Sequence, residues 1–169
     1  MNLIDFKKAL IGGGLAGICC ALFFIVAFSQ KEVHPIARVL DFWIPGLFIA
    51  FFMWWIRKTK PGEAFHFWQG LAIGNVMGFA SGLLSGICLF SVFSLGFDQP
   101  LLNYLNSAKH LLTLQNQQTS EPISPEKMAL VLNEVDSFRP ARFIWEEVFR
   151  KVSYCFVLVP LISIFFRRK

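Results

Sequence analysis

The sequence predicts an all-α integral membrane protein: residues 1–169 form a single membrane domain with four transmembrane helices and a helical extramembrane cap between spans three and four. The chain is 55% hydrophobic and 16% charged, whereas about a quarter of the residues are charged in ordinary soluble domains. Apolar runs flanked by basic residues recur along it, which is typical of membrane spans. Residues 98–141 form the one sizeable hydrophilic region, and they supply the cap.

The first span is predicted at residues 9–29. Lys7 and Lys8 precede a run without charge from Ala9 to Ser29. In a helix that rises about 1.5 Å per residue, such a run crosses a hydrocarbon core about 30 Å thick. A cleaved signal peptide is the alternative, but its apolar region is normally about 7–15 residues long. The length of the run therefore favours a membrane span.

The second span is predicted at residues 36–57, although its uncharged part is short. The extension at its start includes Arg38 and Asp41, whose i,i+3 spacing places both on one face of a helix. We expect these two side chains to form an ion pair at the membrane boundary. At the other end, Trp54–Lys58 combines tryptophans with basic residues, a composition typical of a membrane interface.

The third span is predicted at residues 65–97, after a Lys-Pro-Gly turn signal at 60–62. Inside it a glycine recurs at every fourth position, and each glycine costs a helix about 1 kcal/mol relative to alanine. In lipid, small residues at this spacing let a second helix approach the bare backbone. We therefore predict a helix-packing surface, the glycine row, made of Gly70, Gly74, Gly78, Gly82 and Gly86.

The first span carries a matching row of small residues, and we expect the two rows to face each other within one chain. Contact between two copies of the chain is the alternative. Positions four residues apart drift by about 40° around a helix, so the two ends of the glycine row can serve different neighbours. The small residues of the first span are Ala9, Gly13, Gly17 and Ala21.

The hydrophilic region contains two predicted helices. Apolar residues recur with a helical period over residues 101–112, which predicts an amphipathic helix. The polar stretch 115–125 contains two prolines and predicts a loop. Ser124 followed by Pro125 is typical of a helix start, and it predicts a second helix that continues to Val135.

The last span is predicted at residues 143–166. Its uncharged core begins only at Val152, so we expect the charged residues before it in a helical turn at the membrane surface, where their side chains reach water. Basic residues concentrate in both termini and in the second loop. The positive-inside rule then places both termini in the cytoplasm and residues 98–141 outside. The charged residues before the core are Glu146, Glu147, Arg150 and Lys151.

Asn75, Ser81 and Ser85 are the polar side chains expected deep inside the third span. We favour a structural role, in which they hydrogen-bond across helices. The alternative is a polar track for a solute. Conducting paths and proton relays usually use ionisable groups at mid-depth, and the sequence pattern predicts that the ionisable groups of this chain stay near the membrane boundaries.

No catalytic, metal-binding or cofactor-binding site is predicted. The four cysteines lie in apolar runs without metal-ligand spacing, and the three histidines belong to different segments. Glu63 and His66 are a neighbouring acid and histidine at one interface, and they define a third hypothesis, an enzyme that acts on lipid. The net charge of +5 comes largely from residues beside apolar runs, so nucleic acid is not an expected partner.

The layout of the chain resembles a known family. Phe67-Trp68-Gln69-Gly70 opens the glycine-rich span, and Asp98-Gln99-Pro100 ends it before the leucine-rich residues. These features resemble a domain-of-unknown-function family of small four-span membrane proteins found mainly in Bacteroidota. The resemblance covers nearly the whole chain and implies a bacterial inner-membrane protein with four helices. It implies no catalytic or ligand-binding residues.

The small-residue rows favour a non-catalytic subunit or scaffold that packs against other membrane helices. Its expected partners are the lipid bilayer and either other membrane protein subunits or a second copy of the chain. A small solute transporter or channel that works as an oligomer is the alternative. Asn75 and the two serines of the third span would then line its path.

Overall fold

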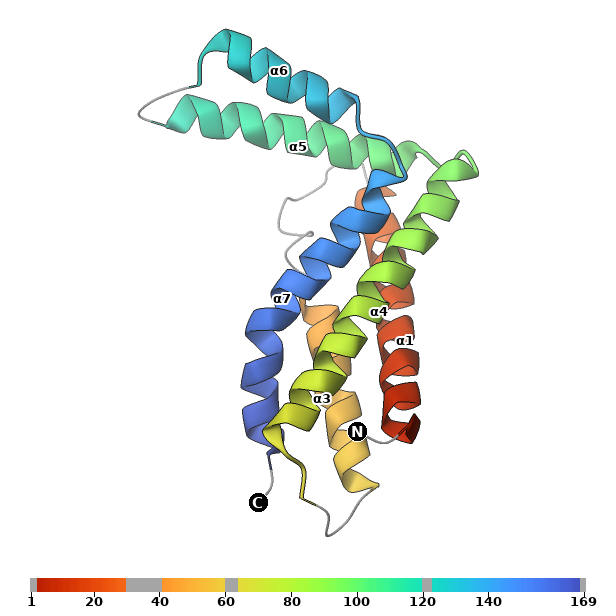
Figure 1. The fold of residues 1–169 in the computed structure, drawn as a ribbon. Coiled ribbons are helices and arrows are strands. Elements are labelled where there is room, and N and C mark those ends of the chain that lie inside the picture. The colour runs from red at the N-terminus through yellow and green to blue at the C-terminus, as the bar shows by residue number, and fades with distance from the viewer. Residues whose placement is uncertain (1–2, 30–40, 60–63, 120–122, 168–169) are drawn as a thin grey trace.

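The computed structural model describes residues 3–29, 41–59, 64–119 and 123–167. Within these ranges the regular structure is helical throughout, which confirms the all-α prediction (Figure 1). The helices are α1 (Leu3–Ser29), α3 (Trp43–Lys58), α4 (Phe67–Ser94), α5 (Gln99–Gln118), α6 (Pro125–Asp136) and α7 (Arg142–Phe166).

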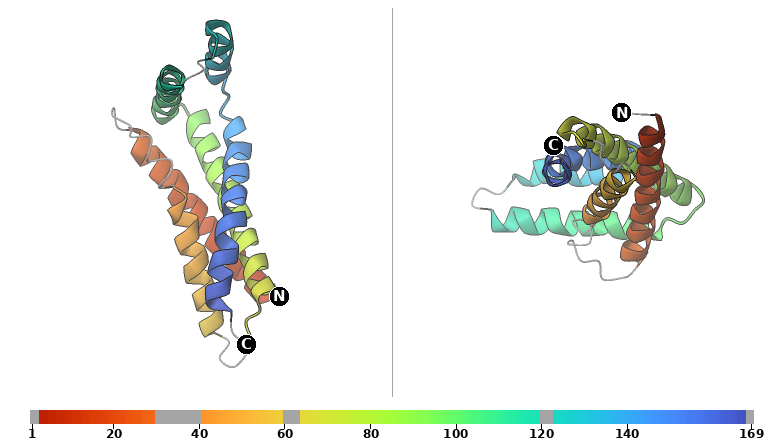
Figure 2. Two further views of the ribbon diagram at one scale, coloured as in Figure 1. Left: turned by 90° about the vertical axis from the view of Figure 1, so that its left-hand side faces the viewer. Right: turned by 90° about the horizontal axis from the view of Figure 1, so that it is seen from below.

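Helices α1, α3, α4 and α7 form a bundle, and α5 and α6 lie across one of its ends as a hairpin, here called the cap (Figure 1). α1 and α4 run toward the cap, whereas α3 and α7 run away from it. The start of α1 and the end of α7 therefore lie together at the opposite end of the bundle. Figure 2 shows that the cap reaches beyond the bundle on the side of α7.

Three of the described helices are long and apolar enough to cross a membrane, over Asp5–Ser29 in α1, Phe67–Ser94 in α4 and Arg142–Phe166 in α7. The chain is thus a multi-pass membrane protein that contacts the lipid bilayer. α3 has 16 residues, which make about 24 Å of helix. This is shorter than a hydrocarbon core of about 30 Å. The start of the predicted second span, residues 36–40, lies outside the described residues.

Two element boundaries differ from the prediction. α1 begins at Leu3, before the basic pair that precedes its apolar run. α5 continues to Gln118 where a loop was expected, because glutamine is a good helix former and the next proline is Pro122. α6 begins at Pro125 directly after Ser124, as the sequence predicts.

The interior of the bundle contains two apolar clusters. The cluster nearer the chain termini receives Met77 from α4 and Cys155 from α7. The cluster nearer the cap receives Leu89 from α4 and Phe143 from α7. α4 and α7 therefore each contribute residues to both clusters. A separate layer of residues lies between the two clusters.

Between the two clusters lie several polar residues, most of which are buried. α4 places two serines there, α7 places three charged residues, and the chain just before α3 adds a carboxylate. Charged side chains are almost never fully buried unless they are paired, so hydrophobic packing alone does not account for this layer. We call it the buried polar layer; its members are Asp41, Ser81, Ser85, Glu147, Arg150 and Lys151.

Candidate functional site

The glycine row sets the distance between α4 and α7. A methyl group added to Gly82 would lie 2.8 Å from Cα of Val148, and one added to Gly86 would lie 2.6 Å from Cα of Ile144. The other three glycines of the row also face side chains of α7. Because glycine has no Cβ, the two helices approach closely along the whole row.

The prediction that the glycine row faces the first span is wrong. α1 packs on another side of α4, where a methyl group added to Gly13 would lie 2.5 Å from O of Met77 and one added to Gly17 would lie 2.6 Å from O of Ser81. Each small-residue row thus faces larger residues of its neighbour. A row of small residues on one helix is enough for a close approach, because the neighbouring helix fills the space that the missing side chains leave.

α7 brings three charged side chains of the buried polar layer to one face. Glu147, Arg150 and Lys151 are spaced i,i+3,i+4, so they project from the same side of the helix. Trp145 and Phe149 are exposed on the outer side. The close approach of α7 to α4 at the glycine row therefore carries the charged face into the interior of the bundle.

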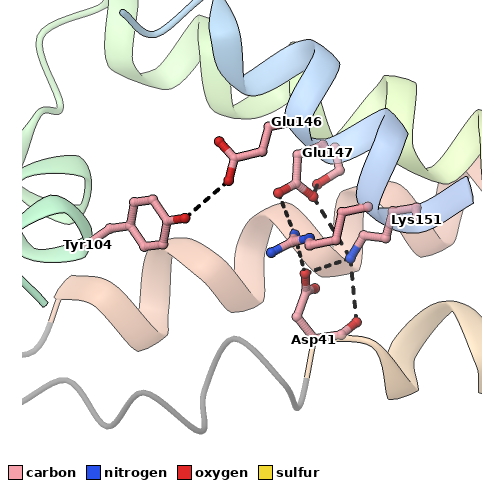
Figure 3. A network of polar contacts seen from close by, with 7 residues as sticks. Asp41, Tyr104, Glu146, Glu147 and Lys151 are labelled. Atoms are coloured by element: carbon pink, nitrogen blue, oxygen red, sulfur yellow. Dashed lines mark hydrogen bonds and ion pairs between the residues drawn. The ribbon is translucent and has the colours of Figure 1, made fainter. Parts of the chain in front are cut away.

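Asp41 joins these residues from the start of α3 (Figure 3). Nζ of Lys151 lies 2.6 Å from Oδ2 of Asp41 and 3.9 Å from Oε2 of Glu147. Nη2 of Arg150 lies 2.8 Å from the same Asp41 oxygen and also pairs with Oε1 of Glu147. From α4, Oγ of Ser85 donates a hydrogen bond of 3.2 Å to Oε2 of Glu147. We call Asp41, Glu147, Arg150 and Lys151 the charge cluster; with two carboxylates and two cations it is formally neutral.

The burial of the charge cluster contradicts the prediction that these residues reach water at the membrane surface. The side chains of Lys151, Glu147 and Asp41 are 0%, 1% and 3% exposed, and that of Arg150 is 15% exposed. α7 is already helical from Arg142, so Lys151 lies about 13 Å along the helix from its start. The apolar cluster nearer the cap covers that first part of the helix.

Sequence reasoning missed the charge cluster because its members are remote in the chain. Asp41 and Lys151 are 110 residues apart, and Arg38, the predicted partner of Asp41, lies outside the described residues. A local signal was present in α7. Trp145 and Phe149, one turn apart, mark an aromatic face opposite the charges, and in lipid an aromatic outer face turns the charged face inward.

The chemistry of the cluster is that of a hydrogen-bonded ion network. Taking a single charge out of water costs several kcal/mol, and close pairing offsets this penalty only when the geometry is good. Removing one partner from such a network typically costs about 3–5 kcal/mol, since a buried charge is left without its counter-ion. Among the described residues, Oδ1 of Asp41 and Nε and Nη1 of Arg150 have no hydrogen-bond partner. The network thus keeps unused acceptor and donor groups.

The three polar residues predicted inside the third span have different surroundings. Ser85 bonds across helices to Glu147. Nδ2 of Asn75 instead donates to O of Leu71 at 2.9 Å, one turn earlier in the same helix. Oγ of Ser81 is buried and has no partner within the described part of the chain. The structure therefore brings Ser85 to the charge cluster, whereas Asn75 is satisfied within its own helix.

The cap is attached to the bundle beside the charge cluster. The hydroxyl of Tyr104 in α5 donates a hydrogen bond of 3.1 Å to Oε1 of Glu146 (Figure 3). Adjacent residues of a helix point about 100° apart, so Glu146 reaches the cap while Glu147 points into the bundle. Nδ2 of Asn103 also donates to O of Phe28, near the end of α1, at 2.7 Å. Polar contacts therefore connect α5 to both α1 and α7.

The described residues contain no group of three or more His, Cys, Asp or Glu side chains that could hold a metal ion. The four cysteines are free; Cys20 and Cys155 are buried. Of the acid and histidine considered for lipid chemistry, His66 is exposed just before α4. Glu63 lies outside the described residues.

Comparison with known proteins identifies a family for the chain. Residues 10–168 match the family described as "Protein of unknown function (DUF4199)". The match confirms, over nearly the whole chain, the resemblance to a family of unknown function. No curated protein and no solved structure matches the chain. The chain therefore belongs to the DUF4199 family.

Proposed function

We propose that the chain is a four-span protein of the bacterial inner membrane that acts as a non-catalytic subunit and packs against a helix of another membrane protein. The observation that carries this proposal is a groove of about 510 Å³ at the junction of the cap and α7. Its lining residues come from α6, from α7 and from the turn between them. Residues that line it include Glu134, Val135, Phe138, Arg142, Trp145 and Phe149.

The outer face of α7 supports this assignment. In the most apolar part of α7, 28% of the residues are buried, compared with 44% in α1 and in α4. Trp145 and Phe149 are exposed there and line the groove. Exposed apolar surface inside a membrane can be covered by acyl chains or by another helix. The polar residues at the rim of the groove distinguish these two occupants. At that rim Arg142 pairs with Glu134 at 3.3 Å, and both side chains are exposed.

A transmembrane helix of a different protein is the occupant that we assign to the groove. The apolar segment of this partner helix would lie along α7, and its polar end would meet charges of both signs at the rim. Aromatic and arginine side chains are the types that most often dominate binding energy at protein interfaces. A lipid or a second copy of the chain is the competing occupant.

We infer that α3 is the fourth span. α1 and α4 both run toward the cap (Figure 1), so the chain has to return across the bundle between them. α3 runs in the required direction and ends at tryptophans followed by basic residues, as expected for a membrane interface. Local thinning of the bilayer accommodates a short helix at modest cost. The basic residues at this end of the bundle support a cytoplasmic location for both termini.

Photocrosslinking in cells tests the subunit proposal. A photoreactive phenylalanine analogue replaces Trp145 or Phe149 in the groove, and Ile11, exposed on α1, is the matched control position. We expect a discrete adduct with one other membrane protein from both groove positions and none from Ile11. Adducts with lipid alone, adducts between two copies of the chain, or equal labelling from Ile11 would contradict the proposal.

A small solute transporter or channel is the second candidate function, and the charge cluster is the observation that favours it. Ionisable residues inside membrane spans often mark ion or proton pathways, and Asp41 and Arg150 retain unused polar atoms. The test is ion flux into liposomes that contain the purified protein. Flux that is lost in a folded Lys151→Met variant would support this candidate, and absence of flux from the unchanged protein would eliminate it.

A further inference from the structure

A second pocket lies at the end of the bundle opposite the cap, where α3 ends. Its volume is about 570 Å³, and it is lined by Phe51, Trp54, Trp55, Lys58 and Thr59. The three aromatic side chains are exposed. The pocket thus combines aromatic walls with a cation, a combination that suits an amphiphilic anion.

Two lysine ammonium groups are held beside this pocket. Nζ of Lys58 lies 5.1 Å from the centroid of the Trp54 ring, and Nζ of Lys8 lies 5.1 Å from that of Trp55. Lys8 also donates a hydrogen bond of 3.3 Å to Oγ1 of Thr59. A contact with an aromatic face orients an ammonium group without neutralising it. Less side-chain freedom is then lost when an anion binds.

The position of Lys8 places the pocket at the edge of the hydrocarbon region. Lys8 directly precedes the uncharged run of α1, which is a candidate span whether or not α3 crosses the membrane. Phe51 lies one turn before Trp54, and their ring centroids are 6.0 Å apart. The pocket therefore extends from the lysines toward the apolar part of the bundle.

We propose that this pocket binds the phosphate headgroup of an anionic phospholipid. The two ammonium groups meet the phosphate, and an acyl chain lies on the exposed ring of Phe51. The hydroxyl of Thr59 donates its proton to O of Ile56 at 2.8 Å and accepts the hydrogen bond from Lys8, so it holds that ammonium group in place. Basic residues at the membrane surface attract anionic lipids, and the aromatic walls favour a lipid over inorganic phosphate. The proposal needs only α1 in the membrane, so it stands or fails separately from the subunit function.

Native mass spectrometry of the detergent-purified protein tests this proposal. The probes are phosphatidylglycerol, phosphatidylcholine and inorganic phosphate. We expect phosphatidylglycerol to be retained about 30-fold more strongly than phosphatidylcholine, since two surface cations contribute about 2 kcal/mol together. The double variant Lys8→Gln/Lys58→Gln should lose this preference. The double variant Lys8→Arg/Lys58→Arg should keep it, because the charge remains.

A matched control removes the same charge from the cap. Lys127→Gln/Arg139→Gln changes two exposed residues at the other end of the molecule, and it should leave the lipid preference unchanged. Equal loss in this control would assign the preference to net charge and overturn the proposal. Displacement of the lipid by millimolar inorganic phosphate would overturn the assignment to a lipid. A Lys8→Gln/Lys58→Gln protein with a native circular dichroism spectrum and undiminished preference would also overturn it.

Discussion

Lys151 and Asp41 form an ion pair of 2.6 Å although both side chains are almost completely buried and the residues lie 110 positions apart. The pair connects α7 to the start of α3, and Arg150 and Glu147 complete its charge balance. Each charge of the cluster depends on the others for compensation. The stability of the bundle is therefore sensitive to any substitution that leaves the cluster with a net charge.

Lys151→Met is expected to destabilise the protein by about 3–5 kcal/mol, because two carboxylates would remain with one cation in the interior. Chemical denaturation of the detergent-solubilised protein measures the change. Arg142→Gln is the matched control, since its ion pair with Glu134 is exposed and contributes at most about 1 kcal/mol. Adding Asp41→Asn to Lys151→Met restores neutrality and should recover part of the loss. Equal destabilisation by Lys151→Met and Arg142→Gln would contradict the prediction.

Gly82→Ala is expected to destabilise the protein by about 1–3 kcal/mol, because the added methyl group would lie 2.8 Å from Cα of Val148. Gly14→Ala is the control, as its methyl group would first meet Cδ2 of Leu84 at 3.5 Å. That variant should be neutral or up to about 1 kcal/mol more stable through helix propensity. Gly78→Leu should destabilise more than Gly82→Ala. Thermal unfolding of the three variants ranks them, and normal stability of Gly78→Leu would refute the packing argument.

If α3 is the fourth span, Lys7 and Ser137 lie on opposite sides of the membrane. If α3 crosses, the start of α1 and the cap face opposite sides; if it does not, they face the same side. Lys7→Cys and Ser137→Cys, each in a background with the native cysteines changed to alanine, report this by labelling. A membrane-impermeant thiol reagent added to spheroplasts should label the Ser137→Cys protein alone. Labelling of both variants, or of the Lys7→Cys protein alone, would contradict the predicted topology.

Tyr104→Phe is expected to loosen the cap without unfolding the bundle. It removes the hydrogen bond from α5 to Glu146, and such a bond contributes about 1 kcal/mol. Amide hydrogen exchange in α5 should become about fivefold faster, while exchange in α4 should not change. Tyr154→Phe makes the same chemical change within α7 and is the control. Unchanged exchange in α5 would show that other contacts hold the cap.

The helices themselves were largely predictable from the sequence, because their signals are local. The uncharged run after Lys8, the glycine row and the Ser124-Pro125 start each depend on neighbouring residues. α4 and α6 follow these signals closely, and α1 contains the uncharged run but begins earlier, at Leu3. The neighbour of the glycine row was not predictable in the same way. A glycine such as Gly82 shows that some helix approaches, but the identity of that helix depends on tertiary packing.

The candidate site was harder to predict, because the environment of a charge depends on residues distant in the chain. Glu147 and Lys151 alone are compatible with an exposed turn at the membrane surface. Their burial requires Asp41 from the chain just before α3 and the close approach that glycine allows between α4 and α7. Nδ2 of Asn75 was expected to bond across helices, but it bonds within α4. Its partner, O of Leu71, is local.

The long separation between Asp41 and its cations has a consequence for biosynthesis. The ribosome makes Asp41 more than a hundred residues before Arg150 and Lys151, so the carboxylate enters the translocation machinery while its counter-ions do not yet exist. Until the final helix is inserted, a nascent chain carries Asp41 without Arg150 and Lys151, the cations that pair with it in the finished bundle. A protein cut short before α7 therefore lacks both cations that pair with Asp41 in the finished bundle.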